Sequence, residues 1–164
     1  MTDIICPFTI LIDDRERRGG YTFEGLRADA NRQYRPLVVP TKEVRLETGD
    51  YSIEGMDELV TIERKSLADL YHTLGQRRNE FEAEHQRMAQ MAFAAVVIET
   101  DLATAIAHPP AESRLHPRCV YRTFLSWSIR FGTHWWWIGG RRGAEKTVFH
   151  ALLDFWNEHS SRRK

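Results

Sequence analysis

The chain has 164 residues, equal numbers of acidic and basic side chains, 42% hydrophobic residues and 28% charged residues. This composition is typical of one globular domain, and it excludes a disordered chain, a collagen-like repeat and a coiled coil. The longest purely apolar run, from Met91 to Ile98, is too short to cross a bilayer, so we expect no contact with a membrane.

The cysteine content and the N-terminus indicate the compartment. The sequence holds two cysteines, Cys6 and Cys119, and neither belongs to a C-x-x-C pair, so we expect no structural zinc site. It also begins without a basic segment followed by an apolar one, the pattern of a secretory leader. These features predict a reducing, cytoplasmic location, associated with the nucleoid if the protein is bacterial.

Charge is distributed unevenly along the chain. Residues 1–63 carry 13 acidic and 8 basic side chains, whereas residues 113–146 carry 7 basic side chains and one acid, Glu145. An acidic half beside a basic half suggests a cation site next to a surface that attracts polyanions. Ordinary solvated faces produce the same distribution, so charge alone does not decide between the two interpretations.

The predicted elements mix short strands with helices. In the first part of the chain we expect a short helix over 24–32 and strands over 8–12, 34–40, 42–46, 59–65 and from 49 to the turn at 54–55. In the second part we expect a helix from Ser66 to 74, a helix from about 79, a strand over 94–98, a helix over 117–131, a strand over 134–138 and a helix near 143–157.

This order predicts an α/β fold with a central mixed sheet, an early antiparallel meander and flanking helices. We expect a single domain over residues 1–164, with its core over about 8–157 and a frayed tail at 160–164.

The acidic residues of this scaffold indicate metal chemistry. Asp13 ends one strand, Asp50 begins another, and Glu63 and Lys65 share one face of a third. Carboxylate oxygens at strand ends are suitable ligands for a hard cation such as Mg²⁺ or Mn²⁺. Lys65 would place an ammonium beside it, where it stabilises developing negative charge. The alternative is an exposed strand face whose Glu and Lys pair across strands, and spacing alone does not exclude it.

The residues around these positions resemble the XPF-type nuclease family. That family is characterised by a strand end of the form V/I-D-x-R-E, a G-D pair, and the motif E-R-K-x-x-x-D. The chain has Ile-Asp-Asp-Arg-Glu at 12–16, Gly-Asp-Tyr at 49–51 and Glu-Arg-Lys-Ser-Leu-Ala-Asp at 63–69. A later segment, which contains Arg78 and then Phe-x-x-Glu-x-x-Arg-Met at 81–88, is also similar to the family.

The resemblance implies a restriction-endonuclease-like core and metal-dependent cutting of DNA near branches, flaps and bubbles, in repair or recombination. It implies Mg²⁺ or Mn²⁺ as the cofactor, with Asp50 and Glu63 as primary ligands and Asp13 as a further ligand. Lys65 becomes the catalytic lysine, and Asp69 completes the acidic cluster.

The family also treats Arg64 as part of the site, although strand alternation points it away from Glu63 and Lys65. Most relatives continue into a tandem helix-hairpin-helix domain, and we expect none here, which leaves branch selectivity open. Because every acid of the motif is present, we expect an active enzyme; the alternative is a DNA-binding scaffold subunit that needs a partner for cutting.

Basic residues late in the chain are candidates for binding the DNA backbone independently of sequence. They lie on the polar face of the helix over 117–131, in the turn at 139–143, and on the helix after the acidic motif. The candidates are Arg78, Arg118, Arg122, Arg130, Arg141 and Arg142. A solvated face is the alternative for all of them.

All five tryptophans lie in the last forty residues, three of them in the strand over 134–138. Alternation places Trp135 and Trp137 on one face of that strand and Trp136 on the other. Core packing accounts for some of these side chains. Their number nevertheless suggests an exposed apolar patch, which predicts a homodimer through the Trp-rich C-terminal part. A platform for stacking bases is the other interpretation.

Overall fold

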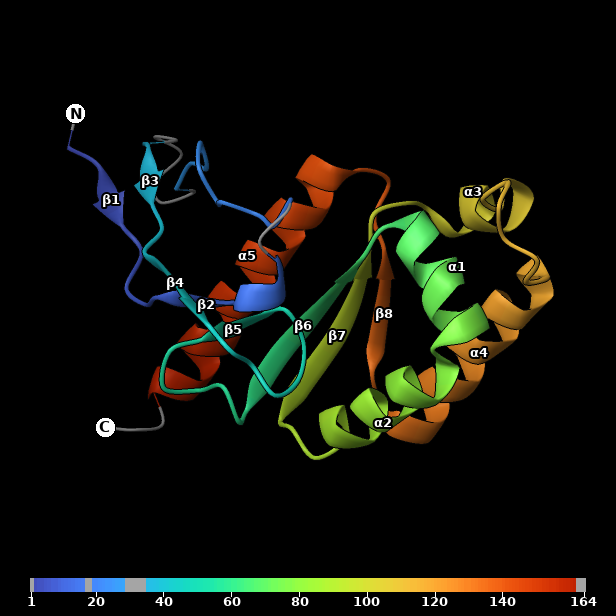
Figure 1. The fold of residues 1–164 in the computed structure, drawn as a ribbon. Helices are drawn as coiled ribbons and strands as arrows, with labels where there is room; N and C mark the ends of the chain where they lie inside the picture. The colour runs from blue at the N-terminus through green and yellow to red at the C-terminus, as the bar shows by residue number, and fades with distance from the viewer. Residues whose placement is uncertain (1, 17–18, 29–34, 162–164) are drawn as a thin grey trace.

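The computed structural model describes residues 2–16, 19–28 and 35–161, which form a mixed sheet between layers of helices (Figure 1). The strands are β1 (Ile4–Ile5), β2 (Ile10–Asp13), β3 (Leu37–Val38), β4 (Thr41–Val44), β5 (Tyr51–Ile53), β6 (Val60–Lys65), β7 (Phe93–Ile98) and β8 (His134–Trp137). The helices are α1 (Leu67–Gln76), α2 (Arg78–Met88), α3 (Leu102–Ala107), α4 (Pro117–Phe131) and α5 (Arg141–Ser160), with a 3-10 turn η1 at Asp14–Glu16. Within these ranges, no helix combines the length and apolar composition that crossing a membrane requires.

The main sheet runs in the order β4-β2-β5-β6-β7-β8, which confirms the predicted central mixed sheet. β5 pairs antiparallel with both β2 and β6, as the predicted meander requires. β4 departs from that meander, because it lies beside β2 and runs parallel to it, with Ile10 opposite Thr41. A parallel pair needs a long connection, and residues 14–40 supply one. β1 and β3 form a separate two-stranded sheet.

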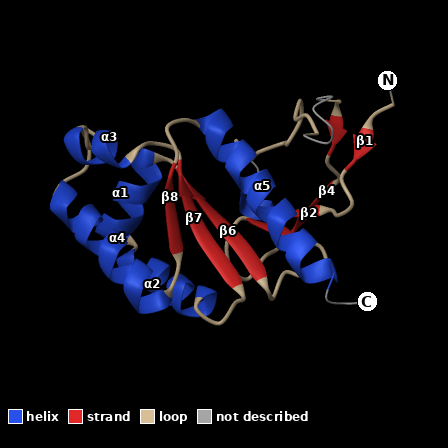
Figure 2. Cartoon of the chain, turned by 180° about the vertical axis from the view of Figure 1, so that it is seen from behind, coloured by secondary structure: helices blue, strands red, loops and turns tan. Residues whose placement is uncertain are grey.

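Helices cover both faces of this sheet: α5 lies on one face, and α1, α2 and α4 lie on the other (Figure 2). Two hydrophobic cores result, which we call the α5 core and the α4 core. In β7, Val97 belongs to the α5 core and Val96 to the α4 core. In β6, Val60 and Ile62 belong to the α5 core, which leaves the opposite side of that strand for Thr61, Glu63 and Lys65, as alternation predicts.

The helix boundaries follow ordinary capping chemistry. The Ser66 hydroxyl accepts the Asp69 N–H at 3.2 Å and begins α1, which confirms the predicted cap. α4 spans the predicted range 117–131 and ends at Gly132, whose φ of 69° reverses the chain. α5 is longer than the predicted 143–157, and α3 was not predicted, because its six residues are too few to show a helical period.

The predicted helix over 24–32 is wrong in its described part. Residues 24–28 form a turn followed by an isolated bridge, and residues 29–32 lie outside the described residues. Phe23 and Gly25 have positive φ angles of 58° and 72°, which turn the chain before a helix can begin.

The tryptophans occupy the two cores and form no exposed patch. Trp127 and Trp135 are buried, and Trp136, Trp137 and Trp156 are half-buried. Trp135 and Trp137 pack in the α4 core and Trp136 packs in the α5 core, so the predicted alternation is confirmed. The inference of exposed tryptophans is wrong, because a sheet with helices on both faces has two cores to receive them.

A buried histidine makes stability depend on pH. His85 Nε2 accepts the Trp135 Nε1–H at 3.2 Å, so its proton lies on Nδ1 and is donated to the Phe81 carbonyl at 2.9 Å. Burial lowers the pKa of His85 to about 4. At pH values between about 6.5 and about 4, His85 is therefore protonated in the unfolded chain and neutral in the folded chain. We therefore expect this residue to remove about 1.4 kcal/mol of stability per pH unit as pH falls below about 6.5.

The measurement is urea unfolding of the wild type and of His85→Gln at several values between pH 7.5 and pH 5. We expect the variant to lose less stability over this range than the wild type does. The exposed His150 offers the matched control, because His150→Gln should keep the wild-type pH dependence. Equal slopes for the wild type and His85→Gln would contradict the prediction.

Candidate active site

Backbone hydrogen bonds among β2, β5 and β6 bring three acidic residues to one place. The Asp13 N–H donates to the Asp50 carbonyl at 2.8 Å, and the Asp50 N–H donates to the Ile62 carbonyl at 3.0 Å. Asp50 Oδ2 also accepts the Arg64 N–H at 2.7 Å. Because β5 lies between β2 and β6, Asp50, which directly precedes β5, lies beside both Asp13 and Glu63.

These acids line one cavity of about 300 Å³ together with side chains of α1 and α2. Its acidic lining residues are Asp13, Glu47, Asp50, Glu63, Glu80 and Glu84, and its basic ones are Arg15, Lys65, Arg77 and Arg87. Six acids against four bases give an excess of negative charge when all are ionised. Such a concave, partly buried surface attracts cations.

The lysine in this cavity is held charged. Lys65 Nζ lies 3.1 Å from Glu63 Oε1 and 5.0 Å from the centroid of the Phe81 ring. Burial lowers the pKa of Lys65, but Glu63 and Asp50 outweigh it and raise the pKa above its ordinary value. The pKa of Asp50 is raised well above its ordinary value by burial and then by repulsion from Glu63 and Glu16. The positive charge of Lys65 therefore does not offset the effects of burial and of repulsion among the carboxylates around Asp50.

α2 supplies a carboxylate to which the sequence alone assigned no role. Glu84 Oε1 accepts the Gly49 N–H at 3.0 Å, which fixes the turn that precedes Asp50. Burial and repulsion from Glu63 raise the pKa of Glu84 to about 8. The signal that could have found it is helical spacing: Phe81 is buried, and a residue one turn later points in nearly the same direction.

The glycine of the G-D pair is required by both space and backbone angle. Gly49 has a φ of 77°, and a Cβ at this position would lie 1.9 Å from Thr61 Oγ1. We expect Gly49→Ala to lower the free energy of unfolding by about 3 kcal/mol or more, from backbone strain and overpacking together. Urea unfolding measures the loss.

The Thr61 contact provides a control. The double variant Gly49→Ala/Thr61→Ala loses the clashing hydroxyl, so it should be less destabilised than the sum of the two single variants. Strict additivity would mean that the close approach does not cause the loss.

Two predicted acids have other roles in the structure. Asp13 is buried, and both its oxygens are occupied: Oδ1 accepts the Leu46 N–H at 3.1 Å and Oδ2 accepts Arg15 Nε–H at 2.6 Å. It therefore anchors Arg15 while it lines the cavity. Asp69 is exposed on the first turn of α1 and is not among the residues that line the cavity.

Arg64 lies on the opposite side of β6 from the cavity, as strand alternation predicts. Its guanidinium donates to Glu16 at 3.2 Å and to Glu99 at 3.1 Å, and it lies 4.9 Å from the centroid of the Tyr21 ring. Its backbone N–H is the donor that holds Asp50. One residue thus joins η1, the end of β7 and the metal-site candidate.

Four of the six arginines predicted to bind DNA are engaged within the protein. Arg78 donates to Thr123 at 2.8 Å, Arg130 to Glu82 at 2.6 Å, Arg141 to the Gly19 carbonyl at 2.5 Å, and Arg142 pairs with Glu145. Arg118 and Arg122 lie exposed one turn apart on α4, and they pair with no acid among the described residues. At the cavity itself the basic residues include Arg77 and Arg87, to which the sequence assigned no role of their own.

Comparison with known proteins agrees with the family resemblance that the sequence motifs indicate. A family model, the ERCC4 domain, matches residues 12–144. Two structures of XPF from Aeropyrum pernix, one of them a complex with DNA, align with TM-scores of 0.62 at 16% identity. The alignments cover 92% and 94% of this chain and 66% and 67% of the XPF chains. This chain therefore spans about two thirds of the length of those proteins. No curated protein matches the sequence.

The family match covers most of the chain, and it includes the three strand-end acids and Lys65. The structural alignment covers 92% of the chain. The chain belongs to the ERCC4 domain family, and its α/β fold is that of an XPF-type nuclease domain.

Proposed function

We propose that this protein is a metal-dependent DNA endonuclease that hydrolyses phosphodiester bonds. The observation that carries the proposal is the cavity in which Asp50, Glu63 and Glu84 crowd around one charged lysine. Membership of the ERCC4 domain family supports this reaction, and the XPF structure in complex with DNA supports DNA as the substrate.

The donors in the cavity fit Mg²⁺ or Mn²⁺. Among the described residues, no three acidic, histidine or cysteine side chains converge enough to hold an ion by themselves. That suits Mg²⁺, which is commonly bound by one or two carboxylates together with waters and substrate phosphates. Asp50 and Glu63 would hold the ion, and Asp13 lines the same cavity. A cation there would relieve the repulsion that raises the pKa of Asp50.

Each side chain of the cavity then has a chemical role. When bound, the ion polarises the phosphodiester and lowers the pKa of a coordinated water. Lys65 holds a positive charge beside Glu63, where it stabilises the negative charge that develops on the phosphate oxygens. The Phe81 ring packs against the ammonium and limits its contact with water. Arg87, which donates to Thr48 Oγ1 at 3.0 Å, lies at the rim, where it can bind a flanking phosphate.

The proposed substrate is branched or flapped DNA in repair or recombination, bound without regard to sequence. Arg118 and Arg122 are the predicted backbone-binding residues that remain free for phosphates among the six named. Contacts of this kind weaken steeply as salt concentration rises. The preference for branches rests on the family alone.

A homodimer is part of the proposal, but through α4 and not through the tryptophans. Tyr121, Leu125 and Ile129 recur at four-residue spacing on this helix and are 41%, 39% and 85% exposed. A stripe of apolar side chains on one helical face is typical of a contact surface. Arg118 and Arg122 lie on the same face of α4, so a dimer formed here and DNA bound by these arginines would compete for that face. We expect a dimer in sedimentation experiments and a monomer for Ile129→Glu. A monomeric wild type at high protein concentration would contradict the homodimer.

The test of function is a cutting assay on duplex, single-stranded, flap, splayed-arm and bubble DNA. We expect cutting with Mg²⁺ or Mn²⁺, and none with EDTA. The alternative is a DNA-binding scaffold subunit that needs a partner. That alternative is supported if the pure protein binds DNA but cuts none of these substrates with either metal, and if Mn²⁺ does not raise its melting temperature.

A further inference from the structure

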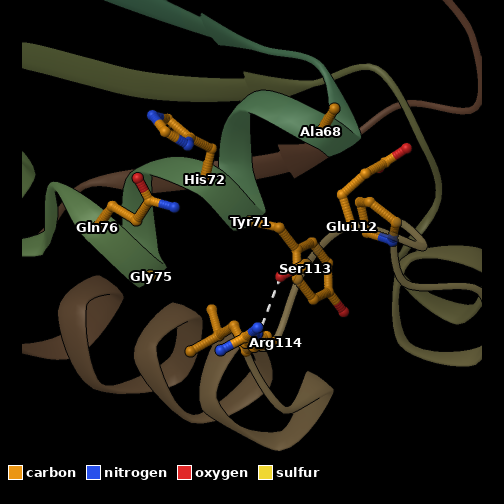
Figure 3. A pocket seen from close by; sticks show the side chains of 10 residues that line it. Ala68, Tyr71, His72, Gly75, Gln76, Glu112, Ser113 and Arg114 are labelled. Atoms are coloured by element: carbon orange, nitrogen blue, oxygen red, sulfur yellow. Dashed lines mark hydrogen bonds between the residues drawn. The ribbon is translucent and has the colours of Figure 1, made fainter.

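A second, larger cavity lies on the other side of α1 from the acidic one. It has a volume of about 690 Å³ and lies between α1 and the segment 110–115 (Figure 3). This size is ordinary for a site that binds a small organic ligand. The α1 residues that open it are small: Ala68 and Gly75 leave room that larger side chains would fill.

The lining combines an apolar floor with a polar rim, as ligand sites commonly do. The floor consists of Ala68, Tyr71, Gly75, Pro110 and Leu115. The rim consists of His72 and Gln76 on the helix and Glu112, Ser113 and Arg114 on the facing segment. Tyr71 is fixed by its hydroxyl, which donates to the Ala105 carbonyl at 2.8 Å. The position of the Tyr71 ring is therefore fixed, and most of the hydrogen-bonding groups of the lining belong to the rim.

The rim carries two exposed charges of opposite sign, Arg114 and Glu112, and neither is paired with an opposite charge among the described residues. Arg118 and Arg122 follow Arg114 at four-residue spacing along the chain, and they too are exposed. The segment that carries Arg114 precedes α4, so the cavity lies near the N-terminal end of the helix that carries Arg118 and Arg122.

α1 places this cavity beside the acidic one. Thr73 and Arg77 of this helix line the acidic cavity, whereas the neighbouring residues His72 and Gln76 line the second cavity. A helix with its side chains is about 10 Å across. A DNA strand whose scissile phosphate lies in the acidic cavity therefore needs only a few nucleotides to reach the second one.

We propose that the second cavity binds an unpaired nucleotide of the DNA strand close to the cut. The base lies on the apolar floor and stacks on the His72 imidazole, the Gln76 amide reads a base edge, and Arg114 binds the phosphate. The inference rests on the proposed function and deepens it, because it makes a single-stranded segment part of the substrate. A free mononucleotide has the same chemistry, and the experiment separates the two sources.

The experiment measures binding without cutting, in Lys65→Ala protein without metal. The probes are a short labelled oligonucleotide, a deoxynucleoside monophosphate and a blunt duplex. Gly75→Leu fills the cavity from a position where a Cβ has only an ordinary contact, 3.9 Å from Leu115 Cβ. Arg114→Gln removes the positive charge of the rim. The matched control is Lys146→Gln, which removes an exposed charge from α5 on the far face of the sheet.

We expect Gly75→Leu and Arg114→Gln each to weaken oligonucleotide binding by about tenfold, with duplex binding nearly unchanged. Lys146→Gln should leave oligonucleotide binding as in the Lys65→Ala parent. Weaker binding of the monophosphate as well would identify the nucleotide itself as the ligand, whereas a loss for the oligonucleotide alone requires a strand. Both results support the site.

Unchanged oligonucleotide binding in both variants, with their melting temperatures intact, would overturn the inference. The proposed function fails separately, because it is judged by metal-dependent cutting in protein that retains Lys65. If the wild type cuts DNA but the cavity variants bind the oligonucleotide normally, only the inference about the second cavity fails. If the wild type cuts no DNA but the cavity variants bind the oligonucleotide less tightly, the nucleotide site is supported and the endonuclease proposal fails.

Discussion

Asp50→Ala should reduce metal-dependent cutting at least about a thousandfold, the scale on which loss of a preorganised charge at a reacting centre is felt. We expect so large an effect because hydrogen bonds to the backbones of both β2 and β6 fix the position of Asp50. Its side chain lines the acidic cavity beside Glu63. Lys65→Ala should also reduce cutting strongly, since no other cation lies within 3.1 Å of Glu63 among the described residues. Initial rates on the preferred DNA substrate measure both effects.

Asp69→Asn is the matched control for these variants. It removes an acid of the same motif, but from an exposed position outside the cavity lining. We expect its cutting rate to stay within a few fold of the wild type, and the Ser66 cap to persist because it uses the Asp69 backbone N–H. Cutting that survives Asp50→Ala would remove the assigned site. A loss in Asp69→Asn as large as in Asp50→Ala would show that the acidic cluster extends to α1.

Metal binding should in turn depend on pH. Burial and repulsion from other carboxylates raise the pKa of Asp50, and they raise that of Glu84 to about 8. Protons compete with the cation for Asp50, and protonation of Glu84 removes a negative charge that attracts the cation, so Mn²⁺ should raise the melting temperature more at pH 8.5 than at pH 6.5. Asp50→Asn should reduce the shift at both pH values. A shift that is independent of pH would contradict this account.

The strand alternation of β6 was sufficient to predict which side each of its polar residues takes. Glu63 and Lys65 face the acidic cavity, and Arg64 faces the other way. The same reasoning placed the tryptophans of β8 correctly on the two faces of their strand. Both results follow because alternation is a property of the strand itself, whatever lies on either side of it.

Features that depend on distant contacts were not predictable in this way. Glu84 enters the site because α2 packs on the same face of the sheet as α1 and α4, and its partner, the Gly49 N–H, lies 35 residues earlier in the chain. Arg130 and Arg141 appeared to be free surface cations in the sequence, but Glu82 and the Gly19 carbonyl engage them. The parallel pairing of β4 also depends on a long connection whose path no local pattern specifies.

The network around Arg64 explains physically why an arginine stands between Glu63 and Lys65. Its guanidinium separates two carboxylates, Glu16 and Glu99, that would otherwise repel each other in a partly buried place. The hydroxyl of Tyr21 donates to Glu99 at 2.6 Å, and that of Tyr51 donates to Glu16 at 3.0 Å. An arginine fits both carboxylates at once because its planar fork has several donors, which a lysine ammonium on a flexible stem cannot replace.

Arg64→Met should therefore lower the free energy of unfolding, by at most about 3–5 kcal/mol, since removal of one partner leaves two partly buried charges uncompensated. Arg64→Lys should recover only part of that loss. The double variant Arg64→Met/Glu99→Gln should be more stable than Arg64→Met, because it removes one of the two unpaired charges. Urea unfolding measures all three.

Cutting assays on the same proteins separate positioning from catalysis. Arg64 does not line the cavity and reaches the site only through its backbone N–H to Asp50. Under conditions in which Arg64→Lys is fully folded, we expect it to cut more slowly than the wild type but far faster than Asp50→Ala. A folded Arg64→Lys as inactive as Asp50→Ala would mean that the guanidinium itself contacts the DNA or the reacting phosphate. The network would then need a second role beyond holding β6 in place.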